Sequence, residues 1–204
     1  IASMSQKDID MALVLRAQAG EYQAFDLLVK KYQHRLIALA QRFVGSTDEA
    51  MDVVQDSFIK VYKALNRFRG ESAFYTWIYR ITVNTAKNYL TSRQRRPQGN
   101  EVDIDDLENG IHSLALHDLA TPESETYRDQ LEKVVMKSID HLPSELRTAL
   151  VLREFDGLSY DDIAIIMDCP IGTVRSRIFR AREAVDHEIQ RASGATVVGE
   201  RVHL

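Results

Sequence analysis

The segment LSYDDIAIIMDCPIGTVRSRIFRAREAV, residues 158–185, has the pattern of two helices joined by a tight turn. Ser159 is suited to cap the first helix because Asp162 follows it three residues later. The helical pattern breaks at residues 168–170, which include a proline, and a second helix begins at residues 172–173. The segment therefore predicts a helix-turn-helix unit.

The second of these helices has two distinct faces when its residues are placed 100° apart. One face is an apolar stripe, expected to be buried, of Val174, Ile178, Ala181 and Val185. The opposite face exposes Phe179 among arginines, which is costly unless another surface covers it. A DNA major groove would cover it, because arginine pairs with guanine edges and an aromatic ring contacts a thymine methyl group. The alternative is a solvated helix with Phe179 packed on a neighbouring element.

The length and composition of the chain limit the classes of protein to which it can belong. The chain has 204 residues, 45% of them hydrophobic and 27% charged, which is ordinary for a globular protein. No run reaches the roughly 20 apolar residues that cross a bilayer, and no signal peptide is visible. The one cysteine, Cys169, excludes an internal disulfide and favours a reducing cytoplasm; we expect it to act as a small buried apolar residue. The six histidines lack metal-ligand spacing, so we expect neither a metal nor a cofactor.

Charge is segregated along the chain although the net value is only −4. Residues 69–96 carry six basic side chains against the single acid Glu71, whereas residues 101–132 carry ten acids against the single base Arg128. The basic segment suits nucleic acid and the acidic segment repels it.

Everything except the middle of the chain has helical periodicity. The expected helices are 8–19, a long one ending at Gly45, 48–68, one capped by Ser72 that extends to Ser92, 127–142, 145–155 and the helix-turn-helix. The pattern predicts an all-α protein of two small helical domains joined by a flexible acidic linker. The predicted parts are a four-helix domain (1–94), the linker (95–125), a helix-turn-helix domain (126–192) and a disordered tail (193–204).

The helix expected at 48–68 has an apolar side of Met51, Val54, Phe58, Tyr62 and Leu65. Its opposite side is charged but includes Val53, which lies between Asp52 and Asp56. An outward valine between two aspartates indicates a docking surface for a basic partner helix. The alternative is an ordinary solvated charged face.

Aromatic residues are dense in FRGESAFYTWIYRITVNTAKNYL, residues 68–90. Helical spacing places Trp77, Arg80, Asn84 and Lys87 on one ridge without acids. Rings interleaved with cations suit single-stranded nucleic acid, because bases stack on the rings and cations hold phosphates.

Four segments in this order resemble the extracytoplasmic-function sigma factors of the envelope-stress, sigma-E type. They are DVVQDSF (52–58), the aromatic segment 68–90, LPSELRTALVLREFDGLSYDDIA (142–164) and CPIGTVRSRIFRAREAV (169–185). The resemblance implies that the chain joins core RNA polymerase, recognises the −35 and −10 promoter elements, promotes DNA melting and starts transcription of envelope-stress genes.

The resemblance also implies residue roles. Asp52, Gln55 and Asp56, beside Val53, are expected to bind the clamp coiled coil of polymerase, and the second domain its flap. A flipped base of the −10 single strand is expected at Phe68 and the following loop, near Trp77 and Asn84, with Arg80 and Lys87 on the backbone. The −35 duplex is expected to contact Arg175, Ser176, Phe179 and Arg180, with Arg153 and Thr173 beside them; Arg177 lies off this face and is assigned to phosphate or structure.

The resemblance further implies a membrane-tethered anti-sigma factor that holds the chain inactive, and a location in the cytoplasm at the nucleoid. No small-molecule substrate is expected. The linker, about 30 residues at roughly 3.3 Å each, spans the roughly 70 Å between the two promoter elements. A conventional dimeric helix-turn-helix regulator and an adaptor that never binds DNA remain alternatives. An enzyme is disfavoured because no nucleophile–base pattern is visible.

Overall fold

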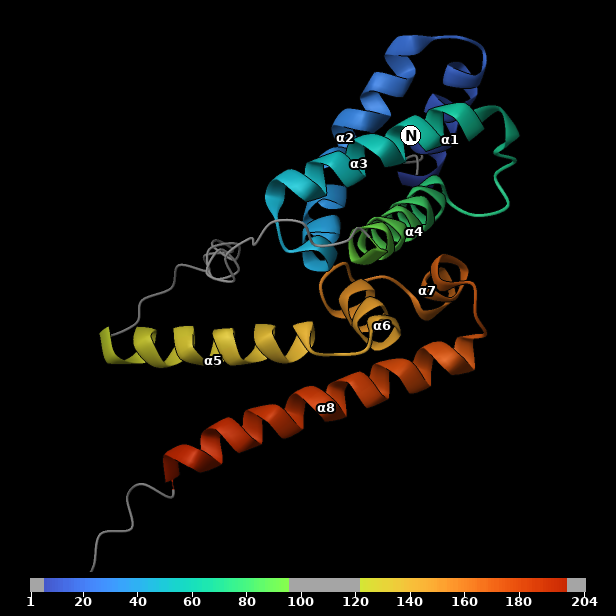
Figure 1. Ribbon diagram of the computed structural model, residues 1–204. Coiled ribbons are helices and arrows are strands. Elements are labelled where there is room, and N and C mark those ends of the chain that lie inside the picture. Colours follow the sequence, from blue (N-terminus) through green and yellow to red (C-terminus); the bar gives the residue numbers. More distant parts are fainter. Residues whose placement is uncertain (1–5, 96–121, 198–204) are drawn as a thin grey trace, which may run out of the picture. The chain divides into compact units, whose positions relative to one another are not determined.

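The computed structural model describes residues 6–95 and 122–197, and this part of the chain is helical without any strand (Figure 1). The elements are α1 (Gln6–Gln18), α2 (Tyr22–Val44), α3 (Thr47–Ala64), the 3₁₀ turn η1 (Leu65–Arg67), α4 (Phe74–Arg95), α5 (Pro122–Asp140), α6 (Ser144–Glu154), α7 (Tyr160–Met167) and α8 (Ile171–Val197). One compact unit contains α1 to α4, and a second contains α5, α6 and α8. The prediction of an all-α protein is confirmed.

The first unit is a bundle in which α3 packs on both α2 and α4. Its fully buried side chains come from all four helices and include Val14, Leu28, Leu36, Leu39, Val53, Val61, Ile78 and Val83. Gly45 ends α2 in the left-handed region at φ 80°, where glycine costs least.

A buried carboxylate fastens α1 to α2. Asp10 is 1% exposed, and it accepts hydrogen bonds from Lys31 Nζ and from the Tyr32 hydroxyl group. Burial, together with the bond to Asp10, raises the pKa of Tyr32 well above its ordinary value. The pairing satisfies a charge that would otherwise be expensive to bury.

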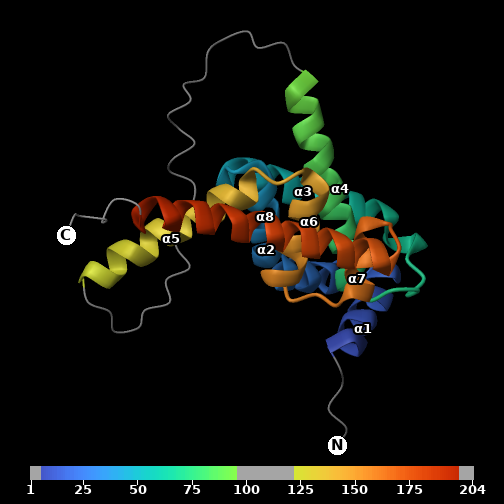
Figure 2. The same ribbon diagram turned by 90° about the horizontal axis from the view of Figure 1, so that it is seen from below.

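In the second unit α8 packs along both α5 and α6, as the views in Figures 1 and 2 agree. The core includes Leu152 of α6 and Ile178 of α8, which are 0% and 2% exposed. The periodicity thus predicted the range of α6 closely, whereas α5 begins and ends earlier than expected.

Three predicted boundaries need correction, the first of which is the start of α5 at Pro122, inside the predicted linker 95–125, instead of at residue 127. The helix expected at 48–68 ends at Ala64, because Leu65–Arg67 tighten into η1 and Phe68 is extended. The tail expected to begin at Ser193 is helical as far as Val197. The central part of the predicted linker, residues 96–121, lies outside the described residues, as do residues 198–204. Among the described helices none is both long and apolar enough to span a bilayer.

Candidate nucleic-acid and protein interfaces

The turn between α7 and α8 has the local bonds that the sequence predicted. The Ser159 hydroxyl accepts a hydrogen bond from the backbone N–H of Asp162 at 3.1 Å and caps α7. Asp168 ends α7 in the left-handed region at φ 52°, and the Cys169 N–H donates to the Ala164 carbonyl at 3.1 Å. The carbonyl of Pro170 then accepts from the Thr173 N–H at 2.9 Å and begins α8. The helix-turn-helix is confirmed.

The exposed face of α8 is also the one predicted. The whole apolar stripe is buried, with exposures of 9% or less at Val174, Ile178, Ala181 and Val185. Phe179 is 61% exposed, between the exposed Arg175 and Arg180, and Ser176 is exposed beside them. The Ser176 hydroxyl donates to the Thr173 carbonyl at 2.9 Å, and Thr173 itself is half-buried. An aromatic ring therefore stands in solvent on the same exposed face as two arginines.

Tyr160 organises two of the arginines, and the sequence reasoning missed it. The Cζ atoms of Arg153 and Arg175 lie 4.7 Å and 5.8 Å from the centre of its ring, within cation–π range. Arg153 is half-buried and also donates to the Leu158 carbonyl at 2.7 Å. The sequence could have indicated Tyr160, because it is an aromatic residue directly after Ser159, which caps α7.

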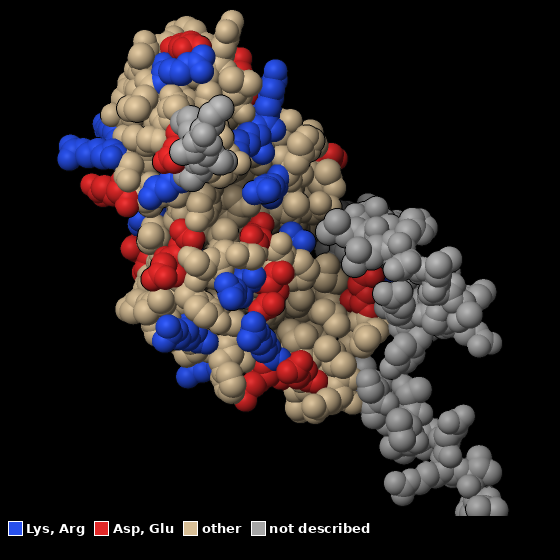
Figure 3. All heavy atoms as spheres, turned by 180° about the vertical axis from the view of Figure 1, so that it is seen from behind, with Lys and Arg blue, Asp and Glu red and all other residues tan. Residues whose placement is uncertain are grey.

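Other arginines of α8 are engaged in ion pairs within the unit. Arg177 pairs with Glu145 at 3.0 Å and approaches the Cys169 sulfur at 3.4 Å, and Arg182 pairs with Glu154 at 2.5 Å. Arg177, which was assigned to phosphate or to structure, therefore has structural contacts within the unit. Cys169 is half-buried and accepts this bond, so it is not the buried apolar residue that we expected. On each unit, the face in Figure 3 shows basic side chains interspersed with acidic ones.

Phe68 and α4 form an aromatic cluster in the first unit. The ring of Phe68 lies 4.8 Å from Trp77 and 5.9 Å from Phe74, between ring centres, and Phe68 is only 8% exposed. Its ring therefore lines the cluster from within rather than standing free. Along α4, Trp77, Arg80 and Lys87 are half-buried and Asn84 is exposed. All four residues of the predicted ridge are thus at least partly exposed on α4.

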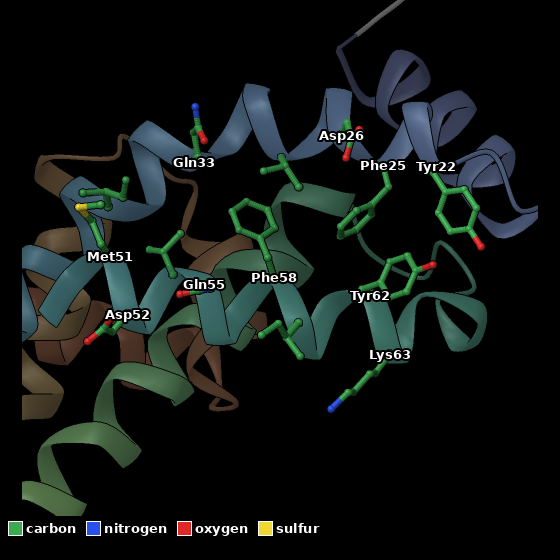
Figure 4. Close-up of a pocket in the computed structure, with 14 residues that line it drawn as sticks. Tyr22, Phe25, Asp26, Gln33, Met51, Asp52, Gln55, Phe58, Tyr62 and Lys63 are labelled. Carbon is green, nitrogen blue, oxygen red and sulfur yellow. The ribbon is translucent and has the colours of Figure 1, made fainter. Parts of the chain in front are cut away.

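An apolar groove of about 700 Å³ runs between α2 and α3. Figure 4 shows Phe25, Phe58 and Tyr62 gathered between the helices, with ring centres of Phe25 and Tyr62 5.0 Å apart, and Asp52 and Lys63 at the border. Tyr22, Met51 and Tyr62 are 71%, 53% and 47% exposed. The sequence reasoning expected Met51 and Tyr62 on a buried side and did not find this groove.

Val53 is 1% exposed, so the expected outward valine is wrong. The reason is that α3 packs on both α2 and α4, and its buried stripe is wider than a helix wheel with one inner side allows. Asp52, Gln55 and Asp56 are exposed as expected. Asp56 pairs with Lys60 at 2.7 Å, and Lys60 also donates to Thr85 of α4 at 3.2 Å.

Glu49 links α3 to the far end of α4. Its carboxylate accepts from Arg93 at 2.8 Å and from the Tyr89 hydroxyl group at 3.1 Å. Desolvation, with the bond to Glu49, raises the pKa of Tyr89. Arg93, one of the six bases of the segment 69–96, is thus partly neutralised within the unit.

Two models of known protein families match the chain. The model of sigma-70 region 2 matches residues 28–96, and that of sigma-70 region 4 matches residues 133–185. The RNA polymerase sigma-H factor of Pseudomonas aeruginosa is 55% identical over 187 residues, which are 92% of this chain and 97% of that protein. The ECF RNA polymerase sigma-E factor of Escherichia coli is 54% identical over the same shares.

The chain therefore belongs to the sigma-70 family of RNA polymerase sigma factors, in its extracytoplasmic-function (ECF) group. Such a sigma factor is not itself an enzyme, as expected.

Two solved structures have the same fold. CnrH in complex with the cytosolic domain of CnrY is 25% identical, with a TM-score of 0.66, and the match covers 90% of this chain and 99% of that one. The sigma factor RpoE of Bartonella quintana in complex with the anti-sigma factor NepR is 25% identical, with a TM-score of 0.64 and coverages of 81% and 96%.

Proposed function

We propose that this sigma factor joins core RNA polymerase, reads a −35 element as duplex through α8 and a −10 element as a separated strand through α4, and starts transcription of envelope-stress genes. The observation that carries the proposal is Phe179, which is 61% exposed between the exposed Arg175 and Arg180 while the opposite stripe of α8 is buried. Exposed apolar area of this kind is stabilised when a groove covers it.

The −35 surface comprises Arg175, Ser176, Phe179 and Arg180 as the base-reading side chains. Arg153 and Thr173 are half-buried beside them and suit contacts to the phosphate backbone. The stacking of Arg153 and Arg175 on Tyr160 favours a fixed direction for both guanidinium groups. A preoriented arginine loses less conformational entropy when it pairs with a guanine.

The −10 surface comprises the loop after Phe68 and the ridge of Trp77, Arg80, Asn84 and Lys87. Phe68 supports this surface from below through its contact with Trp77. An unpaired base gains stacking on an aromatic ring, which offsets the few kcal/mol needed to take it out of the duplex. In this arrangement the cations hold the strand and the rings and amide select the base.

Polymerase docking is assigned to α3 and the adjoining groove. Asp52, Gln55 and Asp56 are exposed on α3 and suit a basic coiled coil such as the polymerase clamp, and Val53 supports the helix from within. The apolar groove between α2 and α3 lies next to these carboxylates, since Asp52 and Gln55 also line it. An apolar centre with a charged rim is the usual anatomy of a protein interface. The second unit is assigned to the flap.

Control by an anti-sigma factor is proposed by analogy, because the structure of the similar sigma factor from Bartonella quintana contains a bound anti-sigma factor. Tethering of that inhibitor to a membrane, with the sigma factor in the cytoplasm at the nucleoid, is the finer form of the proposal. The proposed parts are 1–94 for polymerase and −10 binding and 126–192 for −35 binding, with a linker at 95–125 and a tail at 193–204 of which residues 122–125 and 193–197 belong to α5 and α8.

The test is transcription in vitro by core RNA polymerase and the purified full chain on a promoter library. We expect transcripts to start only when the chain is added, from templates that share a −35 and a −10 sequence. Gln190→Ala, an exposed position on α8 beyond the reading face, is the control for Arg175→Ala. Tight binding of the free chain to duplex DNA, with no start of transcription, would instead support a conventional regulator.

A further inference from the structure

Gln18, at the end of α1, is bonded to the segment that leads into α4. Its side-chain Nε2 donates to the carbonyl oxygen of Leu65 at 2.8 Å and to that of Phe68 at 3.0 Å. These partners lie 47 and 50 residues further along the chain. One amide group therefore ties α1 to both ends of the η1 turn.

The two carbonyl groups belong to a place where the backbone changes direction. The Leu65 carbonyl already accepts from the Phe68 N–H at 3.0 Å, and Phe68 is the extended residue that follows η1. Carbonyl groups at the end of a helical segment have no further partner within it. Both hydrogen bonds from Gln18 are part-buried; without this donor the Leu65 carbonyl would keep its bond from the Phe68 N–H, whereas the Phe68 carbonyl would lose the bond from Gln18.

The side chain of Phe68, whose carbonyl group Gln18 binds, supports the proposed −10 surface. Phe68 packs against Trp77 and Phe74, with ring centres 4.8 Å and 5.9 Å apart. Fixing the Phe68 carbonyl therefore also fixes the ring beneath Trp77. A chain of contacts thus leads from Gln18 of α1 through Phe68 to Trp77.

A second contact between α1 and the same loop lies two residues later. Gly70 has φ +76°, and a Cβ atom built there would be 3.2 Å from the methyl group of Met11 in α1. Glycine suits both the left-handed backbone and this close approach. Gln18 of α1 thus bonds to the loop at its first residue, and Met11 of α1 lies close to it at Gly70.

We propose that Gln18 is a positioning residue for −10 recognition: its two hydrogen bonds hold the Phe68 loop and Trp77 in the shape that selects one unpaired base. This inference rests on the proposed function of α4. A held loop discriminates between bases because it does not adapt to a wrong one, whereas a released loop adapts and discriminates less. Gln18 acts through the loop and does not touch DNA.

Three substitutions distinguish the effect of the hydrogen-bond donor of Gln18 from the effect of the size of its side chain. Gln18→Leu removes the donor at similar size, Gln18→Glu keeps the shape but presents a carboxylate to two carbonyls, and Gln18→Lys keeps a donor. Gln23→Leu, at an exposed position on α2, is the matched control.

The experiment is transcription by holoenzyme, assembled from core RNA polymerase and each full-length variant, on templates randomised across the −10 element. Two hydrogen bonds of ordinary net strength set the upper limit of the effect, so we expect a fall of at least about fivefold, and at most about 150-fold, in preference for the selected base with Gln18→Leu and Gln18→Glu. The −35 preference, read from a second library, is expected to stay unchanged. Gln18→Lys and Gln23→Leu are expected to keep the −10 preference.

Trp77 supplies a readout in the free chain because it is the only tryptophan. We expect Gln18→Leu to increase quenching of its fluorescence by acrylamide, and Gln18→Lys to restore the original value. Helix content from circular dichroism shows whether each variant folds. If Gln18→Leu does not fold, the comparison of Gln18→Glu with Gln18→Lys tests the proposal in its place.

Unchanged −10 preference in Gln18→Leu and Gln18→Glu would overturn the proposal, as would an equal loss in Gln18→Lys. A general loss of −10 and −35 preference in folded variants would also overturn it. Absence of any −10 base preference with the unaltered chain would refute the proposed function instead.

Discussion

Phe179→Ala is expected to weaken −35 recognition while leaving the fold intact. The ring is 61% exposed, so its removal leaves little cavity in the unit. The substitution therefore separates recognition from stability better than any change in the buried stripe of α8.

The expected magnitude follows from the exposed part of the ring. Full burial of a phenylalanine side chain is worth about 1.5–3 kcal/mol, and roughly three-fifths of that is still available in the free chain. Covering it in a groove would contribute about 1–2 kcal/mol, which is about five- to thirty-fold in affinity. This agrees with the range of about 1–3 kcal/mol for one good base contact.

The assay is competition between matched and mismatched −35 sequences for holoenzyme containing the variant. Phe179→Leu should retain much of the preference because it keeps apolar contact, and Gln190→Ala should retain all of it. The midpoint of thermal unfolding should stay near that of the unaltered chain. An unchanged −35 preference in Phe179→Ala would refute the assignment of this face to the groove.

Three further predictions concern the first unit. Asp56→Arg should lower affinity for core polymerase about tenfold, measured by co-purification, without changing thermal stability, because the carboxylate is on the surface; equal recovery would contradict its role in docking. Val53→Ala should instead lower the free energy of unfolding by about 1–3 kcal/mol in denaturant titrations, because Val53 is 1% exposed. Burial, and after it the hydrogen bond to Asp10, raises the pKa of Tyr32 in the folded chain. The protonated hydroxyl group therefore stabilises the fold fully below the pKa of tyrosine in the unfolded chain, about 10, and this stabilisation is lost as the pH rises above that value. Denaturant titrations between about pH 8 and pH 11 should show a fall in the free energy of unfolding, and Tyr32→Phe should remove the part of this pH dependence that comes from Tyr32.

Local patterns were sufficient for much of the second unit. Ser159 with Asp162 predicted the start of α7, and the spacing of Val174, Ile178, Ala181 and Val185 predicted which face of α8 is buried. Both depend on neighbours within a few residues, so the chain itself contains the information. The exposure of Phe179 follows from the same periodicity.

The α2–α3 groove and the burial of Val53 could not be read in this way. A wheel for α3 assumes one buried side, whereas two helices pack on it and together they decide which side chains are covered. The pairing of Arg177 with Glu145 likewise joins residues far apart in the sequence. Such contacts are set by how the helices meet.

The amino-acid sequence by itself determined the all-α class, the helix-turn-helix and the face of α8 that remains in solvent, because hydrophobic periodicity and capping act over a few residues. Only the tertiary structure decided that Gln18 holds the Phe68 loop and that Tyr160 lies between Arg153 and Arg175. The physical reason is that the hydrogen bonds of Gln18 span 47 and 50 residues, and the ring contacts of Tyr160 join three different parts of the second unit; both depend on how whole helices pack, which no local pattern contains.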